Sequence, residues 1–254
     1  MGKLAALLFD VDGTLADTER DGHRVAFNRA FADAGLDWEW SEGLYGELLA
    51  VTGGKERIRH YVGRFHQGFS PPGGCLDHFV AGLHAAKNRH YLRLLEEGAV
   101  PLREGIERLL RQARAEGIRL AIATTTSHEN VTALLRHTLG PEAESWFEVI
   151  GAGDVVAAKK PASDIYEYVL ARMRLSPGDC IAIEDSANGV RAARGAGLCT
   201  VITVNDYTRD DDFDGAALIL DSVGEPARPF SVLAGDVRGA TWLDTRVLES
   251  LIAG

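Results

Sequence analysis

The residues Leu4-Ala5-Ala6-Leu7-Leu8-Phe9-Asp10-Val11-Asp12-Gly13-Thr14-Leu15 decide the fold of this chain. The apolar run that ends at Phe9 predicts a buried parallel strand. Asp10 and Asp12 therefore stand where the strand ends, and Gly13 permits a tight turn after them. Two such carboxylates are typical of a site for a hard cation such as Mg²⁺, and one can act as a nucleophile while the other moves protons. An ordinary Asp-Gly turn has the same local sequence, so the rest of the chain must decide.

From residue 101 onward, predicted helices and strands alternate along the chain. Helical spacing of apolar residues predicts helices over 104–116, 128–137, 165–173, 188–196 and 241–252. Short apolar runs predict strands over 118–123, 147–150, 180–183, 200–204 and 217–220. Strands separated by helices indicate βαβ units, and therefore an α/β fold with a doubly wound, Rossmann-like parallel sheet.

Residues 18–95 interrupt this alternation, because they contain helical patterns but no convincing buried strand. The expected helices cover 25–34, 42–49, 56–65 and 78–95. We therefore predict a core formed by residues 1–17 and 96–254, with an all-helical cap domain inserted over 18–95.

Composition narrows the class of protein. With 254 residues and 46% apolar content, the chain can bury a sizeable core, and its net charge of −10 argues against nucleic-acid and anionic-membrane partners. The three cysteines show no metal-ligand spacing, and their odd number argues against a disulfide framework. The first apolar run is too short for a signal peptide, and no run is long enough to span a bilayer. We expect a cytoplasmic protein, monomeric, with a small-molecule partner.

Polar side chains gather where the predicted strands end. In an open parallel sheet, ligands bind beyond the carboxyl ends of the strands. The residues predicted at or beside that edge are Asp10, Asp12, Thr124, Thr125, Lys160, Glu184 and Asp185. Singly, each could be a helix cap or a solvated charge. Together, the carboxylates repel one another unless a metal ion and a lysine neutralise them, and a hydroxyl and an ammonium group beside a metal suit a phosphate.

At these residues the chain resembles the haloacid dehalogenase superfamily. Asp10-Val-Asp12-Gly-Thr-Leu resembles its first motif, and Thr124 at a strand end resembles its second. Lys160-Pro161 resembles the third motif, and Glu184-Asp185-Ser186 followed by Gly189-Val190 resembles the fourth. The dehalogenases that name the superfamily lack the second aspartate of the first motif, so Asp12 favours phosphoryl transfer.

The predicted cap domain resembles that of the β-phosphoglucomutase-like branch. Within that branch, three strings resemble the CbbY group: residues 18–24 (TERDGHR), 53–57 (GGKER) and 160–166 (KPASDIY). Proteins of that group are associated with the Calvin cycle and dephosphorylate sugar bisphosphates, notably the rubisco by-product xylulose-1,5-bisphosphate. The resemblance therefore implies a Mg²⁺-dependent phosphatase that hydrolyses a sugar bisphosphate through an aspartyl-phosphate.

The resemblance also implies roles for individual residues. Asp10 is the nucleophile, and Asp12 is the acid and base. The Asp10 and Asp185 carboxylates and the Asp12 backbone carbonyl hold the metal, while Glu184 is a ligand or an acceptor for metal-bound water. The phosphate is held by Thr124 and the backbone N–H groups that follow it, starting with Thr125, and by Lys160. The cap residues expected to bind substrate are Glu19, His23, Lys55, Arg57 and Lys87.

Two alternative functions remain, and the first of them would use the same residues. A sugar phosphomutase would return the phosphate to a different sugar hydroxyl instead of to water. A non-catalytic protein that binds sugar phosphate as a signal would need no proton carrier at Asp12.

Overall fold

The computed structural model describes residues 3–51 and 53–252, and its chain divides into two units. One unit comprises the chain up to Asp17 and from Pro101 onward, and the other is Thr18–Val100. The helical unit ends later than the residue 95 expected from the sequence. Val100 is buried within it, where a Cβ atom on Gly22 would lie 3.3 Å from its side chain.

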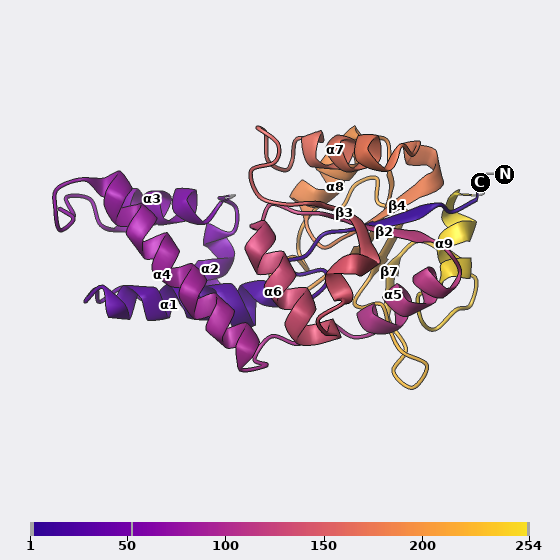
Figure 1. The fold of residues 1–254 in the computed structure, drawn as a ribbon, viewed down its shortest axis with the longest axis horizontal. Helices are drawn as coiled ribbons and strands as arrows, with labels where there is room; N and C mark the ends of the chain where they lie inside the picture. The colour runs from indigo at the N-terminus through magenta and orange to yellow at the C-terminus, as the bar shows by residue number, and fades with distance from the viewer. Residues whose placement is uncertain (1–2, 52, 253–254) are drawn as a thin grey trace. The chain divides into compact units, whose positions relative to one another are not determined.

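The larger unit is built on one sheet with strand order β3-β2-β1-β4-β5-β6-β7 (Figure 1). The strands are β1 (Ala6–Phe9), β2 (Arg119–Ala123), β3 (Phe147–Gly151), β4 (Cys180–Glu184), β5 (Cys199–Thr203), β6 (Leu218–Leu220) and β7 (Val232–Ala234). All pairs are parallel except β6 and β7. The predicted fold class is confirmed. The antiparallel edge strand β7 was not predicted, because its exposed residues show no alternation between buried and solvated positions.

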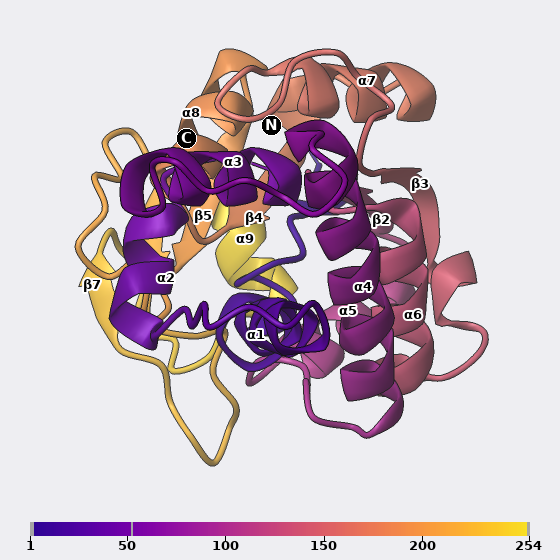
Figure 2. The ribbon, with the colours of Figure 1, turned by 90° about the vertical axis from the view of Figure 1, so that its left-hand side faces the viewer.

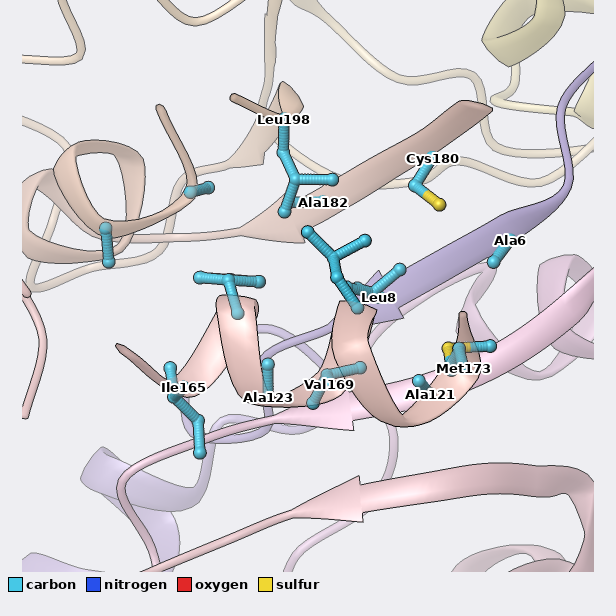
Figure 3. Packing of buried hydrophobic residues seen from close by; sticks show 14 residues of the cluster. Ala6, Leu8, Ala121, Ala123, Ile165, Val169, Met173, Cys180, Ala182 and Leu198 are labelled. Carbon is cyan, nitrogen blue, oxygen red and sulfur yellow. The ribbon is translucent and has the colours of Figure 1, made fainter. Parts of the chain in front are cut away.

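Helices cover both faces of this sheet. On one face, α7 (Asp164–Met173) and α8 (Ala187–Gly195) pack over the central strands. Figure 3 shows Leu8 of β1, Ala182 of β4 and Val169 of α7 as members of one buried cluster. On the other face lies α5 (Ile106–Ala115) (Figure 1). Because neighbouring strand residues point to opposite faces, a strand covered on both sides must be apolar throughout, as β1 is.

The remaining elements of this unit are α6 (His128–Leu139), α9 (Thr245–Ile252) and the short 3₁₀ turns at Ala143–Trp146 and Pro177–Asp179. Helix α9 begins later than the predicted residue 241. It packs against α5. Thr245 Oγ1 accepts a hydrogen bond from Gln112 Nε2 at 2.9 Å and donates one to Glu116 Oε2 at 2.6 Å. Val247 of α9 and Leu243 just before the helix are buried, whereas Leu251 is half-buried.

In the helical unit, a π-helical turn, η1 (Thr18–His23), leads into α1 (Arg24–Asp33). There follow α2 (Glu42–Leu48), α3 (Gly54–Phe65) and α4 (Leu76–Glu96), and α1 and α4 lie side by side (Figure 2). Its core is rich in aromatic rings. The ring centroid of Trp40 lies 4.6 Å from the ring centroid of Phe27 and 5.0 Å from that of Phe31. No helix in the described parts of the chain is both long and apolar enough to cross a membrane.

Candidate active site

Three carboxylates meet at one edge of the sheet because two neighbouring parallel strands end there. Phe9 of β1 is in register with Ile183 of β4, and the Asp10 backbone N–H donates to the Ile183 carbonyl at 3.0 Å. Asp10 directly follows Phe9, and Glu184 and Asp185 directly follow Ile183, so the three carboxylates lie at the same edge of the sheet. One oxygen from each of these buried carboxylates lies within 4.8 Å of the others.

Lys160 lies in the loop that precedes α7, and its side chain lies among these carboxylates. Its Nζ donates to Asp10 Oδ1 at 2.7 Å and to Glu184 Oε1 at 2.5 Å. Tyr166, in the first turn of α7, donates its hydroxyl to the same Glu184 oxygen at 2.5 Å, and its ring centroid lies 5.2 Å from Lys160 Nζ. Tyr166 therefore fixes Glu184 and flanks Lys160, a role that its sequence position alone does not indicate.

The cluster carries more negative than positive charge. Burial raises the pKa of Asp10 to about 7, and the charges of Glu184 and Asp12 also raise it, whereas Lys160 lowers it. Burial, together with Asp10 and Glu184, raises the pKa of Asp185 well above its ordinary value. Although burial alone would lower the pKa of Lys160, the carboxylates of Asp10 and Glu184 raise it, so this ammonium stays charged. Lys160 alone does not offset the three carboxylates, although the charge of Arg103 acts on Asp185 as well, so an added cation fits the cluster.

Two residues missed at the sequence level hold the turn after β1. Asn205 donates from Nδ2 to Asp185 Oδ2 at 2.6 Å and to the Gly13 carbonyl at 3.4 Å. The Arg103 guanidinium also donates to the Gly13 carbonyl, and to the Thr203 carbonyl at 2.9 Å. Asn205 could have been found, because it follows β5 at the same sheet edge. Arg103 could not, because no local pattern marks its loop.

The other predicted core residues lie around this cluster. Asp12 is half-buried in the turn after β1, near enough for its charge to act on Asp10. Thr124 is buried at the end of β2, the other neighbour of β1, and its Oγ1 accepts from the Thr126 N–H at 3.4 Å. Thr125 is half-buried in the loop that leads to the first turn of α6. Backbone N–H groups that open a helix suit an anion.

In the helical unit, the predicted Glu19 and Arg57 meet at Tyr45. Arg57 is buried, and its Nη1 donates to Tyr45 Oη at 2.9 Å while its Nε donates to the Leu48 carbonyl at 3.2 Å. Tyr45 in turn donates its hydroxyl to Glu19 Oε2. The structure therefore connects two predicted residues through a third that the sequence did not indicate.

The remaining cap residues surround the imidazole of His84. Burial lowers the pKa of His84 to about 4, and the positive charges of Lys87, Lys55, His23 and Arg57 lower it further. These four predicted cap residues therefore lie close enough to act on one half-buried ring. A neutral His84 beside these cations leaves the cluster positive, and it would attract an anion.

Aromatic rings support two of these residues from within the same unit. Lys87 is buried, with its Nζ 5.3 Å from the Phe27 ring centroid and 5.2 Å from that of Tyr91. The His23 ring lies 4.1 Å from the Tyr91 ring. Ring faces stabilise a buried ammonium without neutralising its charge, so Lys87 keeps its attraction for anions.

Comparison with known proteins agrees with the site's chemistry. A family model described as haloacid dehalogenase-like hydrolase matches residues 4–197. The plasmid protein CbbY of Cupriavidus necator is 47% identical over 249 residues, covering 97% of this chain and 96% of that protein. The crystal structure of CbbY from Rhodobacter sphaeroides in complex with phosphate is 47% identical, with a TM-score of 0.79, covering 86% of this chain and 94% of that one.

A second crystal structure from Rhodobacter sphaeroides contains a CbbY mutant in complex with xylulose-(1,5)bisphosphate. It is 46% identical to this chain, with a TM-score of 0.79, and the match covers 88% of this chain and 98% of that one.

Proposed function

We propose that this member of the haloacid dehalogenase-like hydrolase family hydrolyses a sugar bisphosphate. The chain is a relative of the CbbY proteins and is a sugar-phosphate phosphatase. Xylulose-1,5-bisphosphate is the proposed compound, because a CbbY structure that is 46% identical to this chain contains it. The observation that carries the reaction is the buried Asp10–Lys160 contact of 2.7 Å within a cluster of carboxylates.

In the proposed mechanism, Asp10 attacks phosphorus and forms an aspartyl-phosphate while the sugar oxygen leaves. Asp12 gives that oxygen a proton and then takes a proton from the water that cleaves the intermediate. Lys160 stays protonated because the Asp10 and Glu184 carboxylates raise its pKa, so it can neutralise charge that develops on the phosphoryl oxygens. Thr124 and the backbone N–H groups after it hold the other oxygens.

The carboxylate cluster fits Mg²⁺, which prefers oxygen ligands. We propose that the Asp10 and Asp185 carboxylates and the Asp12 backbone carbonyl would hold it, with Glu184 as a ligand or as an acceptor for metal-bound water. When bound, the ion would offset the repulsion between the Asp10 carboxylate and the phosphate. Tyr166 and Lys160 both donate to Glu184 Oε1, and Asn205 donates to Asp185, so the protein orients these oxygens itself.

A substrate with two phosphates needs a second group of cations, because the chain as a whole carries a net charge of −10. The helical unit provides one in Lys55, Arg57 and Lys87, all of which act on His84, as does the neighbouring His23. We propose that this cationic cluster binds the phosphate that is not hydrolysed, and that Glu19 contributes to binding the sugar. Each charge-assisted contact with phosphate contributes about 1.5–3 kcal/mol, enough to favour the bisphosphate about tenfold or more.

The first experiment compares kcat/KM for xylulose-1,5-bisphosphate and xylulose 5-phosphate in the presence of Mg²⁺, measured as phosphate release. We expect the wild type to prefer the bisphosphate at least about tenfold and Lys55→Ala and Arg57→Ala to lose most of that preference. Equal efficiency on both substrates, or equal losses on both in the variants, would contradict the two-phosphate proposal. Conversion to an isomeric bisphosphate without phosphate release would indicate a mutase.

A second experiment tests the nucleophile. Asp10→Asn keeps the size of the side chain but cannot attack phosphorus, so we expect turnover to fall by several orders of magnitude. The circular dichroism spectrum and the Mg²⁺-dependent binding of the bisphosphate should remain close to those of the wild type. Substantial residual turnover in the purified variant would exclude Asp10 as the nucleophile.

A further inference from the structure

One buried hydroxyl joins two substrate-binding candidates of the helical unit. Tyr45 of α2 is fully buried, and its hydroxyl donates to Glu19 Oε2 and accepts from Arg57 Nη1 at 2.9 Å. We propose that Tyr45 is a positioning residue that sets the preference for a bisphosphate by fixing Glu19 and Arg57. The inference rests on the proposed function, in which those two side chains bind substrate.

The Tyr45 hydroxyl lies between the charged groups of Arg57 and Glu19 and keeps them from direct contact. Arg57 Nη1 and Glu19 Oε2 lie 3.9 Å apart, too far for a hydrogen bond between them. A tyrosine hydroxyl has one proton to donate and lone pairs to accept, so it can serve the carboxylate and the guanidinium at once. Without it, buried Arg57 and half-buried Glu19 each lose a partner, and direct contact between them is the nearest replacement. Such a contact would direct the Arg57 charge toward Glu19 and away from an anion.

Helix α2 also holds Arg57 at further points. The Leu48 carbonyl, in the next turn after Tyr45, accepts from Arg57 Nε at 3.2 Å. The Tyr45 ring itself lies under the guanidinium, with 5.2 Å from Arg57 Cζ to the ring centroid. Phenylalanine at position 45 would keep the ring contact and the Leu48 hydrogen bond. Removing the hydroxyl alone therefore isolates the bridge between Arg57 and Glu19.

Tyr61 offers a matched control in the same aromatic core. It is also buried, its ring lies 5.4 Å from that of Trp40, and the Tyr45 ring lies 5.7 Å from the same tryptophan. The Tyr61 hydroxyl, however, pairs with His66 Nε2 at 3.0 Å. Tyr61→Phe therefore removes a tyrosine hydroxyl from this unit without breaking the contacts of Glu19 and Arg57.

The test measures kcat and KM of the full-length wild type, Tyr45→Phe and Tyr61→Phe with Mg²⁺. The substrates are xylulose-1,5-bisphosphate and p-nitrophenyl phosphate, which carries no second phosphate. We expect Tyr45→Phe to raise KM for the bisphosphate about tenfold and to leave kcat and p-nitrophenyl phosphate hydrolysis within about twofold of the wild type. Tyr61→Phe should match the wild type on both substrates.

A double variant tests whether Tyr45 acts through Arg57. In an Arg57→Ala background, adding Tyr45→Phe should raise KM for the bisphosphate by clearly less than it does in the wild type, because only Glu19 is left for the hydroxyl to position. A rise in KM as large as that in the wild-type background would overturn the proposal, as would similar effects of Tyr45→Phe and Tyr61→Phe. A loss of kcat on both substrates in Tyr45→Phe would indicate a purely structural role and would also overturn it. If the wild type does not prefer the bisphosphate, the proposed function fails first, and this inference fails with it.

Discussion

Gly13 lies against the carboxylate of Asp185, so close that a Cβ atom at position 13 would come within 2.3 Å of Asp185 Oδ2. The same Cβ atom would lie 2.6 Å from Asn205 Nδ2, the donor that orients this carboxylate. Gly13 has a φ of +84°, a conformation that residues with a side chain rarely adopt. The residue therefore provides both the turn after β1 and the space that the Asp185 carboxylate occupies.

Gly13→Ala should reduce kcat/KM more than about a hundredfold, because it displaces Asp185 and Asn205 as well as straining the turn. Gly117→Ala is the control, since Gly117 has a φ of +76° but no atom within 4 Å of its Cβ position. The control should lower the free energy of unfolding by about 1 kcal/mol and leave kcat/KM unchanged. Urea denaturation and steady-state kinetics measure both effects. Equal activity in the two variants would show that the space beside Asp185 does not matter.

Removal of the proposed metal should lower thermal stability through Asp185. We expect Mg²⁺ to raise the Tm of the wild type in a concentration-dependent manner, because a ligand that binds only the folded state stabilises it. Asp185→Asn should lose most of this increase. Asp179→Asn should keep it, because half-buried Asp179 lies just before β4, at the opposite end of that strand from Asp185. An unchanged Mg²⁺ response in Asp185→Asn would exclude that carboxylate as a ligand.

Acid should destabilise the helical unit through His84. Burial and the surrounding cations lower the pKa of His84 from 6.5 to about 4 in the folded state, so below pH 6.5 the unfolded chain takes up the proton more readily. This contribution to stability is present above pH 6.5 and is lost as the pH falls toward 4. The Tm of the wild type should therefore fall more steeply over this range than that of His84→Gln. His78→Gln changes an exposed histidine of the same helix and should behave like the wild type.

The Tyr166 hydroxyl should matter for catalysis more than for folding. Tyr166→Phe removes one donor to Glu184 Oε1 and leaves Lys160 as the other, so we expect kcat to fall about tenfold and the free energy of unfolding by about 1 kcal/mol. The control is Tyr168→Phe, because Tyr168 lies on the same helix but pairs with Arg172 Nη2, at 3.1 Å. Equal kcat in the two variants would contradict the assigned role.

Arg103 should be essential for stability as well as for activity. Its guanidinium donates to backbone carbonyls from three segments, including those of Gly13, Thr203 and Asp221. Arg103→Met removes all of these hydrogen bonds at once, and the Gly13 carbonyl then keeps the longer one from Asn205. We expect urea denaturation to show a loss of about 2–4 kcal/mol, together with reduced kcat. Arg194→Met removes only an exposed contact with Asp214 and should cost less than about 1 kcal/mol. Losses of similar size would contradict this view of Arg103.

The sequence alone was sufficient for the parallel sheet and for much of the composition of its carboxylate cluster. Apolar runs separated by helical periods leave few topologies, and parallel strands bring their carboxyl ends to one edge. Asp10 and Glu184 could therefore be placed together although they are far apart in sequence. The same rule could have identified Asn205, which follows β5. Strand β7 was not predicted, because an exposed three-residue edge strand has no buried face and therefore no alternation of apolar and polar residues.

Only the tertiary structure decided which side chains hold the functional groups in place. Tyr166 reaches Glu184 because α7 packs across the sheet, and Tyr45 reaches both Glu19 and Arg57 because three helical segments meet there. Local periodicity records which face of a helix is buried, but it does not record which element packs against that face. A sequence therefore indicates the reacting groups at strand ends, whereas their supporting hydrogen bonds depend on contacts between distant segments.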